Sequence, residues 1–425
     1  MKYNLPMAIW VVVANMIGTG IYSSLGFQLV DIHDLFSIIM LWVIGGMISL
    51  CGAYVYSRLA NNMPDAVGEY HYLSRLVHPS IGFLSSWISI TVGFAAPIAL
   101  LLKTMCAYLP STLLNINVEF WVLIALVCIT AVHMQSYTAS RGFHSIVTIF
   151  KIVFLILFVV VGFLVGRKQM VSFAPSETTI STMTSNTFAT ALVYVLYTYS
   201  GWNASTYLAR ELPDPKRTLP QSMLTGTLLV AVLYIALNLL FLYVAPTHAL
   251  MVDVRTYEPK ELLVIVAVYI LPTMSVDVMQ GICCFLLMSS MSSMILAGPR
   301  VTAAIAEQYS VLGVLAKRSS QGIPLNAIGL QTIIAVVLFV SNTFEDTLKF
   351  TAMMLTLSSM ATAASIIRIE RKILTVLAAL IFLVANVWVL IHVAQSNPAS
   401  LTWTAAIIGL GIVLYITLRL GKRTE

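Results

Sequence analysis

Long apolar stretches, separated by short polar connections, recur along the whole chain. Each holds about 20 residues, the length that an α-helix needs to cross a hydrocarbon core of about 30 Å. The pattern predicts an all-α membrane protein with twelve transmembrane helices in one domain, residues 1–425. The predicted crossings are residues 7–30, 36–60, 82–108, 119–137, 142–166, 187–209, 219–245, 273–306, 325–342, 346–366, 372–393 and 400–419.

A further apolar stretch at residues 261–271 is too short to cross a bilayer. Pro259 and Pro272 stand on either side of it, and proline marks the limits of a helix. We therefore expect an interfacial or re-entrant helix here.

Basic residues are distributed unequally between the two sides of the predicted membrane. With the N-terminus inside, 16 lysines and arginines face the cytoplasm and 6 face outward, while Lys151 lies within the membrane. The positive-inside rule then places both termini in the cytoplasm. The inner set is Lys2, Arg58, Arg75, Arg141, Arg210, Lys216, Arg217, Arg300, Lys317, Arg318, Arg368, Arg371, Lys372, Arg419, Lys422 and Arg423. The outer set is Lys103, Arg167, Lys168, Arg255, Lys260 and Lys349.

Composition excludes several classes of protein. Charged residues make up only 9% of the chain and hydrophobic residues 59%, whereas soluble domains carry about 25% charged residues. The basic residues form no patch, so we expect no nucleic-acid partner. We find no metal-ligand spacing and few acids in the crossings, so we expect no metal, no cofactor and no enzymatic activity. The seven histidines are expected at interfaces: His33, His71, His78, His133, His144, His248 and His392.

Two glycines interrupt the first predicted crossing in mid-membrane. The segment reads Asn-Met-Ile-Gly-Thr-Gly-Ile at residues 15–21, and glycine weakens a helix relative to alanine. Close helix packing through small residues is one explanation. The other is a local unwinding, which would leave backbone N–H groups and the positive end of a half-helix dipole free to bind a carboxylate.

A similar interruption occurs five helices later. Residues 197–203 read Tyr-Thr-Tyr-Ser-Gly-Trp-Asn and again place a small pair in mid-crossing. Corresponding interruptions in two halves of a membrane protein indicate a transporter site between inverted repeats. Tyr197 and Trp202 are either packed aromatics or covers for a substrate.

Lys151 is the only charge in the 25 residues between Arg141 and Arg167. An ammonium group at this depth costs at least about 2.5–3.5 kcal/mol, so it should face the bundle interior and have partners there. A snorkelling lysine is the alternative, although Lys151 lies about ten residues from the cytoplasmic entry and has apolar neighbours.

Several motifs together resemble the amino acid–polyamine–organocation (APC) superfamily, and within it the L-type amino acid transporters, the light chains of heteromeric transporters. Residues 199–203 (Tyr-x-Gly-Trp-Asn) and 211–220 (Glu-Leu-x-Asp-Pro-x-Arg-x-Leu-Pro) are similar to the sixth helix of that family and the loop after it. Residues 15–21 resemble the first-helix motif, residues 53–87 the signature after helix 2, and residues 298–301 (Gly-Pro-Arg-Val) the end of helix 8.

The resemblance implies a LeuT-like fold with a 5+5 inverted repeat, residues 1–166 and 187–366, in which helices 1 and 6 are broken. Two peripheral helices would follow at residues 372–419. The substrate carboxylate would meet the N–H groups of Thr19, Gly20 and Ile21, and its ammonium group the carbonyls of Met16, Tyr197 and Ser200. Tyr197 would be an aromatic gate and Asn203 a polar brace. Lys151 would replace a sodium ion and hold carbonyls near Gly18 and hydroxyls of helix 8. The candidates there are Ser289, Ser290, Ser292 and Ser293, each of which could also be a packing residue.

Sodium-independent transport of amino acids, as exchange of neutral L-amino acids by alternating access, is the function that this resemblance implies. A proton-coupled importer, in which Lys151 releases its proton, is the alternative. The partners would be the amino acid and membrane lipid. The light chains carry a cysteine between helices 3 and 4 that bonds a heavy chain, but residues 108–118 have none, so no disulfide-linked heavy chain is expected. The first apolar run is followed by no small-residue cleavage site, so we expect no removable signal peptide. The short tails favour a prokaryotic, self-sufficient transporter of the bacterial cytoplasmic membrane.

Overall fold

The computed structural model describes residues 4–109, 117–253, 260–341, 343–396 and 398–421. The predicted charges Lys2, Arg255, Lys422 and Arg423, and most of the connection at 108–118, lie outside these residues.

The described residues form helices and loops, without a β-strand. The first half contains α1 (Leu5–Met16), α2 (Thr19–Asp31), α3 (Leu35–Asn62), α4 (Gly68–Leu76), α5 (Pro79–Ile88), the π-helix η1 (Ser89–Gly93), α6 (Ala95–Tyr108), α7 (Val118–Gln135), α8 (Tyr137–Val165), α9 (Thr179–Met183), α10 (Asn186–Thr198) and the 3₁₀-helix η3 (Trp202–Glu211). The second half contains α11 (Pro215–Val244), α12 (Thr247–Leu250), α13 (Leu262–Ile270), α14 (Val276–Ala306), the 3₁₀-helix η4 (Ser310–Leu312), α15 (Gly313–Ala316), α16 (Leu325–Ser341), α17 (Phe344–Ser365), the 3₁₀-helix η5 (Ile366–Arg368), α18 (Ile373–Ser396) and α19 (Pro398–Gly421).

Ten helical stretches in the described part of the chain are long and apolar enough to cross a membrane. They coincide with ten of the predicted crossings. The other two predicted crossings lack such a helix: residues 187–209 are divided between α10 and η3, and α16 has 17 residues. The extra apolar stretch forms α13, whose nine residues are too short to cross at about 1.5 Å per residue.

Polar residues begin helices where the predicted connections end. The side chain of Asp34 accepts a hydrogen bond from the backbone N–H of Ser37 at the start of α3. Asp214 caps α11 in the same way, and Pro215 occupies the first position of that helix. Such caps satisfy N–H groups that have no partner within the helix.

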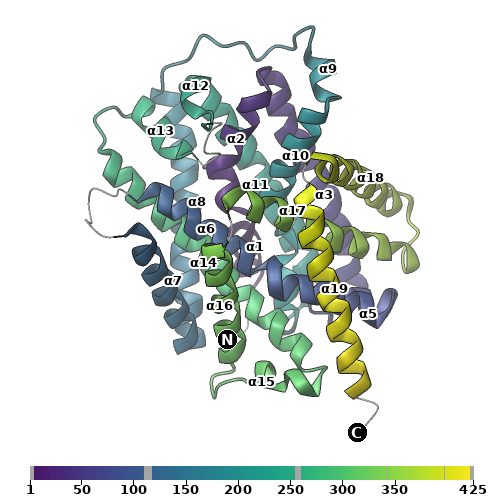
Figure 1. Cartoon of the computed structure of the whole chain (residues 1–425). Coiled ribbons are helices and arrows are strands. Elements are labelled where there is room, and N and C mark those ends of the chain that lie inside the picture. The colour runs from purple at the N-terminus through teal and green to yellow at the C-terminus, as the bar shows by residue number, and fades with distance from the viewer. Residues whose placement is uncertain (1–3, 110–116, 254–259, 342, 397, 422–425) are drawn as a thin grey trace.

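Packing is densest around α14. Of an apolar 18-residue stretch in α14, 78% of the residues are buried inside the protein, compared with 17% for such a stretch in α19. α14 packs against α6, α7, α8 and α16, while α11 lies along α3 and α1. In Figure 1, α9, α12 and α13 lie at the upper end of the molecule, and α15 and the end of α19 at the lower end. We call these ends the upper and lower sides.

Candidate functional site

The first crossing is broken at its middle. α1 ends at Met16 and α2 begins at Thr19. Gly18 between them is extended, with φ −123° and ψ −152°, and no side chain caps α2. The first-turn N–H groups of Thr19, Gly20 and Ile21 therefore have no partner within the helix, and they stand at the positive end of its dipole.

The second break lies against the first. α10 ends at Thr198, and the chain turns through Gly201 before η3 begins. Gly201 has φ +106°, a left-handed conformation that favours glycine. A Cβ at Gly201 would lie 3.2 Å from the carbonyl carbon of Asn15 and 3.3 Å from the nitrogen of Met16. Glycine thus allows the two breaks to meet.

Tyr234 of α11 connects the two breaks. Its hydroxyl lies 2.6 Å from the carbonyl oxygen of Met16 and 3.2 Å from that of Thr198, the last residues of the two half-helices. The hydroxyls of Ser24 and Thr198 are 3.1 Å apart. The carbonyl of Met16, one of the predicted ammonium acceptors, thus already accepts a bond from Tyr234. No feature of the sequence indicates this role, because Tyr234 lies in an uninterrupted apolar helix.

A central cavity opens beside the breaks and encloses about 850 Å³ of empty space, including its mouth. A smaller cavity adjoins it at the N-terminus of α2. Among the predicted site residues, Tyr197, Ser200 and Asn203 line the central cavity, and Met16, Gly18, Thr19 and Gly20 line the smaller one. Ile21 is not among the residues that line either cavity. The remaining polar lining of the central cavity is Asn15, Glu69, Ser89, Tyr207, Thr356, Ser359 and Asn386.

Lys151 is fully buried between the first break and α14. Its Nζ donates to the carbonyls of Ala14 (3.2 Å) and Ile17 (2.8 Å) and to the hydroxyl of Ser290 (3.0 Å). An ammonium group has three N–H donors, so these three acceptors can satisfy it. The carbonyl that it meets near Gly18 is that of Ile17.

The other serines of α14 have different neighbours. Ser289 lies 3.4 Å from Thr148. Ser292 lies 2.8 Å from His133 Nε2 and 3.4 Å from His144 Nδ1. The Ser293 hydroxyl is buried and has no hydrogen-bond partner among the described residues. Only Ser290 of this row therefore contacts Lys151.

His133 and His144 correct the prediction that every histidine is interfacial. Both are buried between α7, α8 and α14, and His133 also bonds Ser140 at 2.6 Å. A histidine near a helix end can be buried or exposed, depending on which side of the helix it occupies. The sequence alone did not show that side for His133 and His144.

An aromatic stack lies above the central cavity. The ring of Phe27 is 5.4 Å from that of Tyr194 and 6.1 Å from that of Phe344. Tyr197, which lines the cavity, packs against this cluster. Stacked rings from α2, α10 and α17 therefore adjoin the cavity through Tyr197.

Glu69 lies at the lower end of the cavity and is buried. Its Oε2 accepts a hydrogen bond from Ser358 at 2.8 Å, and its Oε1 one from Asn203 at 3.3 Å and one from Tyr56. Ser85 lies 3.3 Å from Oε2. Burial raises the pKa of the Glu69 carboxyl, and these donors act in the opposite direction. The sequence signal was a glutamate in the loop signature of residues 53–87, to which we had assigned no role.

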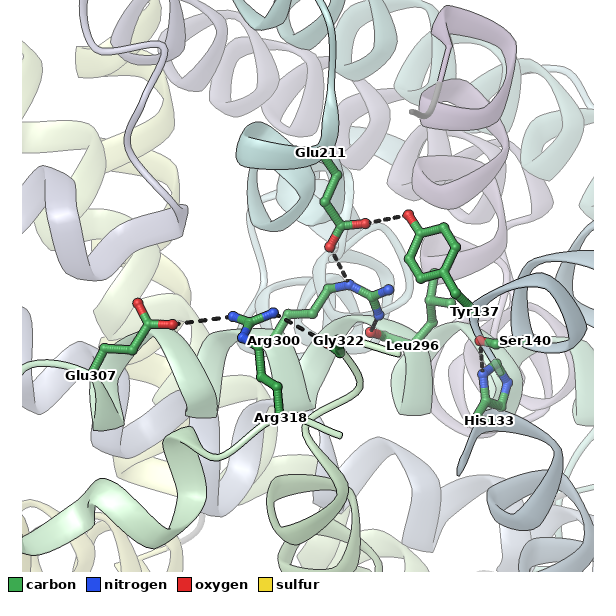
Figure 2. A network of polar contacts seen from close by, with 9 residues as sticks. All are labelled: His133, Tyr137, Ser140, Glu211, Leu296, Arg300, Glu307, Arg318 and Gly322. Carbon is green, nitrogen blue, oxygen red and sulfur yellow. Dashed lines mark hydrogen bonds and ion pairs between the residues drawn. The ribbon is translucent and has the colours of Figure 1, made fainter. Parts of the chain in front are cut away.

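Below η3, a polar network joins four parts of the chain. Figure 2 shows the carboxylate of Glu211 between Tyr137 and Arg300, at 2.6 Å and 2.8 Å. Arg318 pairs with Glu307 at 3.2 Å, and Glu307 also pairs with Arg210. The network ties the end of η3 to α8, α14 and the loop after α15.

A helical membrane protein with two broken helices beside a buried polar cavity has the features of a carrier for a small molecule. The chain belongs to the amino acid permease family, whose profile it matches over residues 3–420. This confirms the resemblance to the APC superfamily. The family is one of permeases and not of enzymes.

The chain is only distantly similar in sequence to individual relatives. The chain is 25% identical over 261 residues to b(0,+)-type amino acid transporter 1 of Mus musculus, covering 59% of this chain and 53% of the relative. It is 25% identical over 252 residues to the serine/threonine exchanger SteT of Bacillus subtilis, covering 57% and 55%. To Amino acid transporter protein 6 of Caenorhabditis elegans it is 23% identical over 318 residues, covering 72% and 59%. The chain spans about half the length of these relatives.

Proposed function

We propose that the chain carries neutral L-amino acids across a membrane by alternating access, as a sodium-independent exchanger. The observation that carries this proposal is Lys151, whose ammonium group lies between the first break and Ser290 with three acceptors. A fixed cation at this point leaves no place for a sodium ion.

The substrate site would lie between the breaks. The carboxylate would bind the N–H groups of Thr19, Gly20 and Ile21. The ammonium group would bind the carbonyls of Tyr197 and Ser200, and that of Met16 if it can share its oxygen with Tyr234. A zwitterion suits this arrangement because the start of α2 offers N–H donors, whereas the ends of α1 and α10 offer carbonyl acceptors.

The topology that we propose has twelve crossings in a LeuT-like inverted repeat. The α10–η3 pair and α16 are the two crossings added to the ten long helices. The lower side would face the cytoplasm of a bacterium, because most basic residues belong there by the positive-inside rule. The relatives named as exchangers or transporters support the substrate class.

Uptake into proteoliposomes tests this function. Labelled neutral amino acid should enter vesicles preloaded with unlabelled amino acid, at the same rate with and without sodium. Empty vesicles should accumulate little. Strong accumulation into empty vesicles under a pH gradient alone would instead establish the proton-coupled alternative, and dependence on sodium would contradict the role given to Lys151.

A further inference from the structure

We propose that Tyr207 is the lower gate of the transport path and that Glu69 positions it through Asn203, an inference that rests on the proposed transport through the central cavity. No predicted site residue had this role. The argument depends on a second cavity, on the contacts that hold Tyr207, and on the helix type of η3.

A second cavity lies below the first and encloses about 770 Å³, including its opening. Its lining includes Arg210 and three residues of the network in Figure 2, Glu211, Arg300 and Arg318. Among the described residues, Tyr207 is the only one that lines both this vestibule and the central cavity. The Tyr207 side chain thus stands between the predicted substrate site and the lower side.

Three contacts hold Tyr207 in this position. Its hydroxyl accepts a hydrogen bond from Nδ2 of Asn203 at 2.9 Å. Its ring lies edge-on to Phe94, with centroids 5.4 Å apart. Its other side covers Gly68, where a Cβ would lie 2.6 Å from Cδ1 of the ring. Gly68 also has φ +66°, so both its backbone and its contact with Tyr207 favour glycine.

Asn203 links Tyr207 to Glu69. An amide group has two N–H donors, and Asn203 directs one to Tyr207 and the other to Oε1 of Glu69 at 3.3 Å. Glu69 in turn accepts bonds from Tyr56 of α3 and Ser358 of α17. The donors described for Glu69 are hydroxyls and an amide, so this carboxyl group connects η3 to neighbouring helices without a basic partner.

The lower half of the broken helix is built in a way that suits movement. η3 is a 3₁₀-helix of ten residues, whereas such helices rarely exceed three or four residues and often mark hinges. Its last residues pair with the end of α14: Arg210 with Glu307 in a half-exposed ion pair, and Glu211 with Arg300 in one that is mostly buried. A rotation of η3 would carry Tyr207 away from Phe94 and connect the two cavities.

Accessibility of the central cavity from each side tests the gate. The reporter is Ser359→Cys, in the cavity lining, in a background with the five native cysteines replaced. A membrane-impermeant maleimide is applied to inside-out and right-side-out vesicles, with Tyr269→Ala on the half-exposed face of α13 as matched control. Tyr207→Ala should raise labelling from the lower side about tenfold or more, since loss of one hydrogen bond alone shifts an equilibrium by about this factor, and should leave the upper side unchanged.

Two milder variants separate gating from folding. Tyr207→Phe keeps the ring but removes the acceptor for Asn203, and Glu69→Gln replaces one acceptor oxygen by a donor. Both should raise lower-side labelling by less than Tyr207→Ala, and Glu69→Asp should restore part of the protection. Lower-side labelling equal to the parent in all variants, or an equal rise on both sides, would overturn the gate. This readout needs no substrate, so a failed exchange assay with the expected labelling would refute the proposed function and leave the gate standing.

Discussion

Gly18 and Gly20 stand two residues apart at the first break, yet a Cβ would meet different surroundings at each. At Gly18 nothing lies within 4 Å of that position. At Gly20 a Cβ would lie 2.7 Å from Cβ of Thr198 on α10. The two glycines therefore have separate tasks: Gly18 leaves space beside the N-terminus of α2, and Gly20 allows the half-helices to approach.

The two alanine variants should consequently differ. Gly20→Ala should destabilise the protein by about 1–3 kcal/mol, the usual cost of overpacking. Gly18→Ala should keep its stability but weaken substrate binding, because its methyl group enters the small cavity at the break. Thermal unfolding in detergent and a binding titration on both variants check this. Equal loss of stability in both would contradict the division of tasks.

A second prediction at the scale of single residues concerns Lys151. Lys151→Met roughly preserves the volume of the side chain but removes the Lys151 donor from the carbonyl of Ala14 and leaves that of Ile17 with Ser290 alone. Unsatisfied buried groups cost about 1–3 kcal/mol each, enough to change the balance between two conformations by one or two decades. Exchange should slow at least about tenfold while substrate still binds; Lys168→Met, at an exposed site, is the control. An unchanged exchange rate would mean that Lys151 has no part in the cycle.

At the scale of elements, the sequence predicted the breaks and Lys151 because each departs from its own surroundings. Paired glycines in an apolar helix, and one charge among 25 residues, are visible locally. Tyr234, Tyr207 and Glu69 are not, because their roles depend on distant parts of the chain, such as Met16 for Tyr234, 218 positions away, and Ser358 for Glu69, 289 positions away. The approximate limits of the crossings followed from the lengths of the apolar stretches, whereas no sequence signal indicated the 3₁₀ form of η3.

Arg58 of α3 and Glu370, before α18, form an ion pair at 2.9 Å that joins distant elements. Desolvation raises the pKa of the Glu370 carboxyl, but hydrogen bonds from Arg58, Thr375 and Asn62 outweigh it and hold this pKa below its usual value of 4.5. The pair therefore stabilises the fold above pH 4.5, and this contribution disappears as the pH falls through the lowered pKa.

Glu370→Gln should consequently lower stability at neutral pH by about 1.5–3 kcal/mol, the range for hydrogen bonds to charged groups. Well below pH 4.5 the parent carboxyl is also neutral, so the difference between the two proteins should shrink. Unfolding temperatures measured against pH check this, with the exposed Glu177→Gln as control. A difference that persists unchanged in acid would show that the charge of Glu370 is unimportant.

At the scale of the whole molecule, the central cavity adjoins the ring stack through Tyr197 and the lower vestibule through Tyr207, which we propose as the gate. In the proposed orientation, the vestibule below Tyr207 faces the cytoplasm. Cysteines placed at Lys317 and Lys372 should both react with an impermeant reagent only from the cytoplasmic side, as expected if each lies in a basic inner connection. Labelling from opposite sides would mean that one crossing has been counted wrongly between them.

We expect the exposed face of α8 to make the exchange rate depend on the thickness of the bilayer. α8 has 29 residues and would measure about 43 Å at 1.5 Å per residue, more than a hydrocarbon core of about 30 Å. Its exposed side chains are apolar over several turns, from Ile146 through Val153 to Leu164, so this helix should tilt or locally thicken the lipid. Because the same helix holds Lys151 against the first break, vesicles made from short-chain and long-chain lipids should differ in exchange rate even though no lipid touches the substrate.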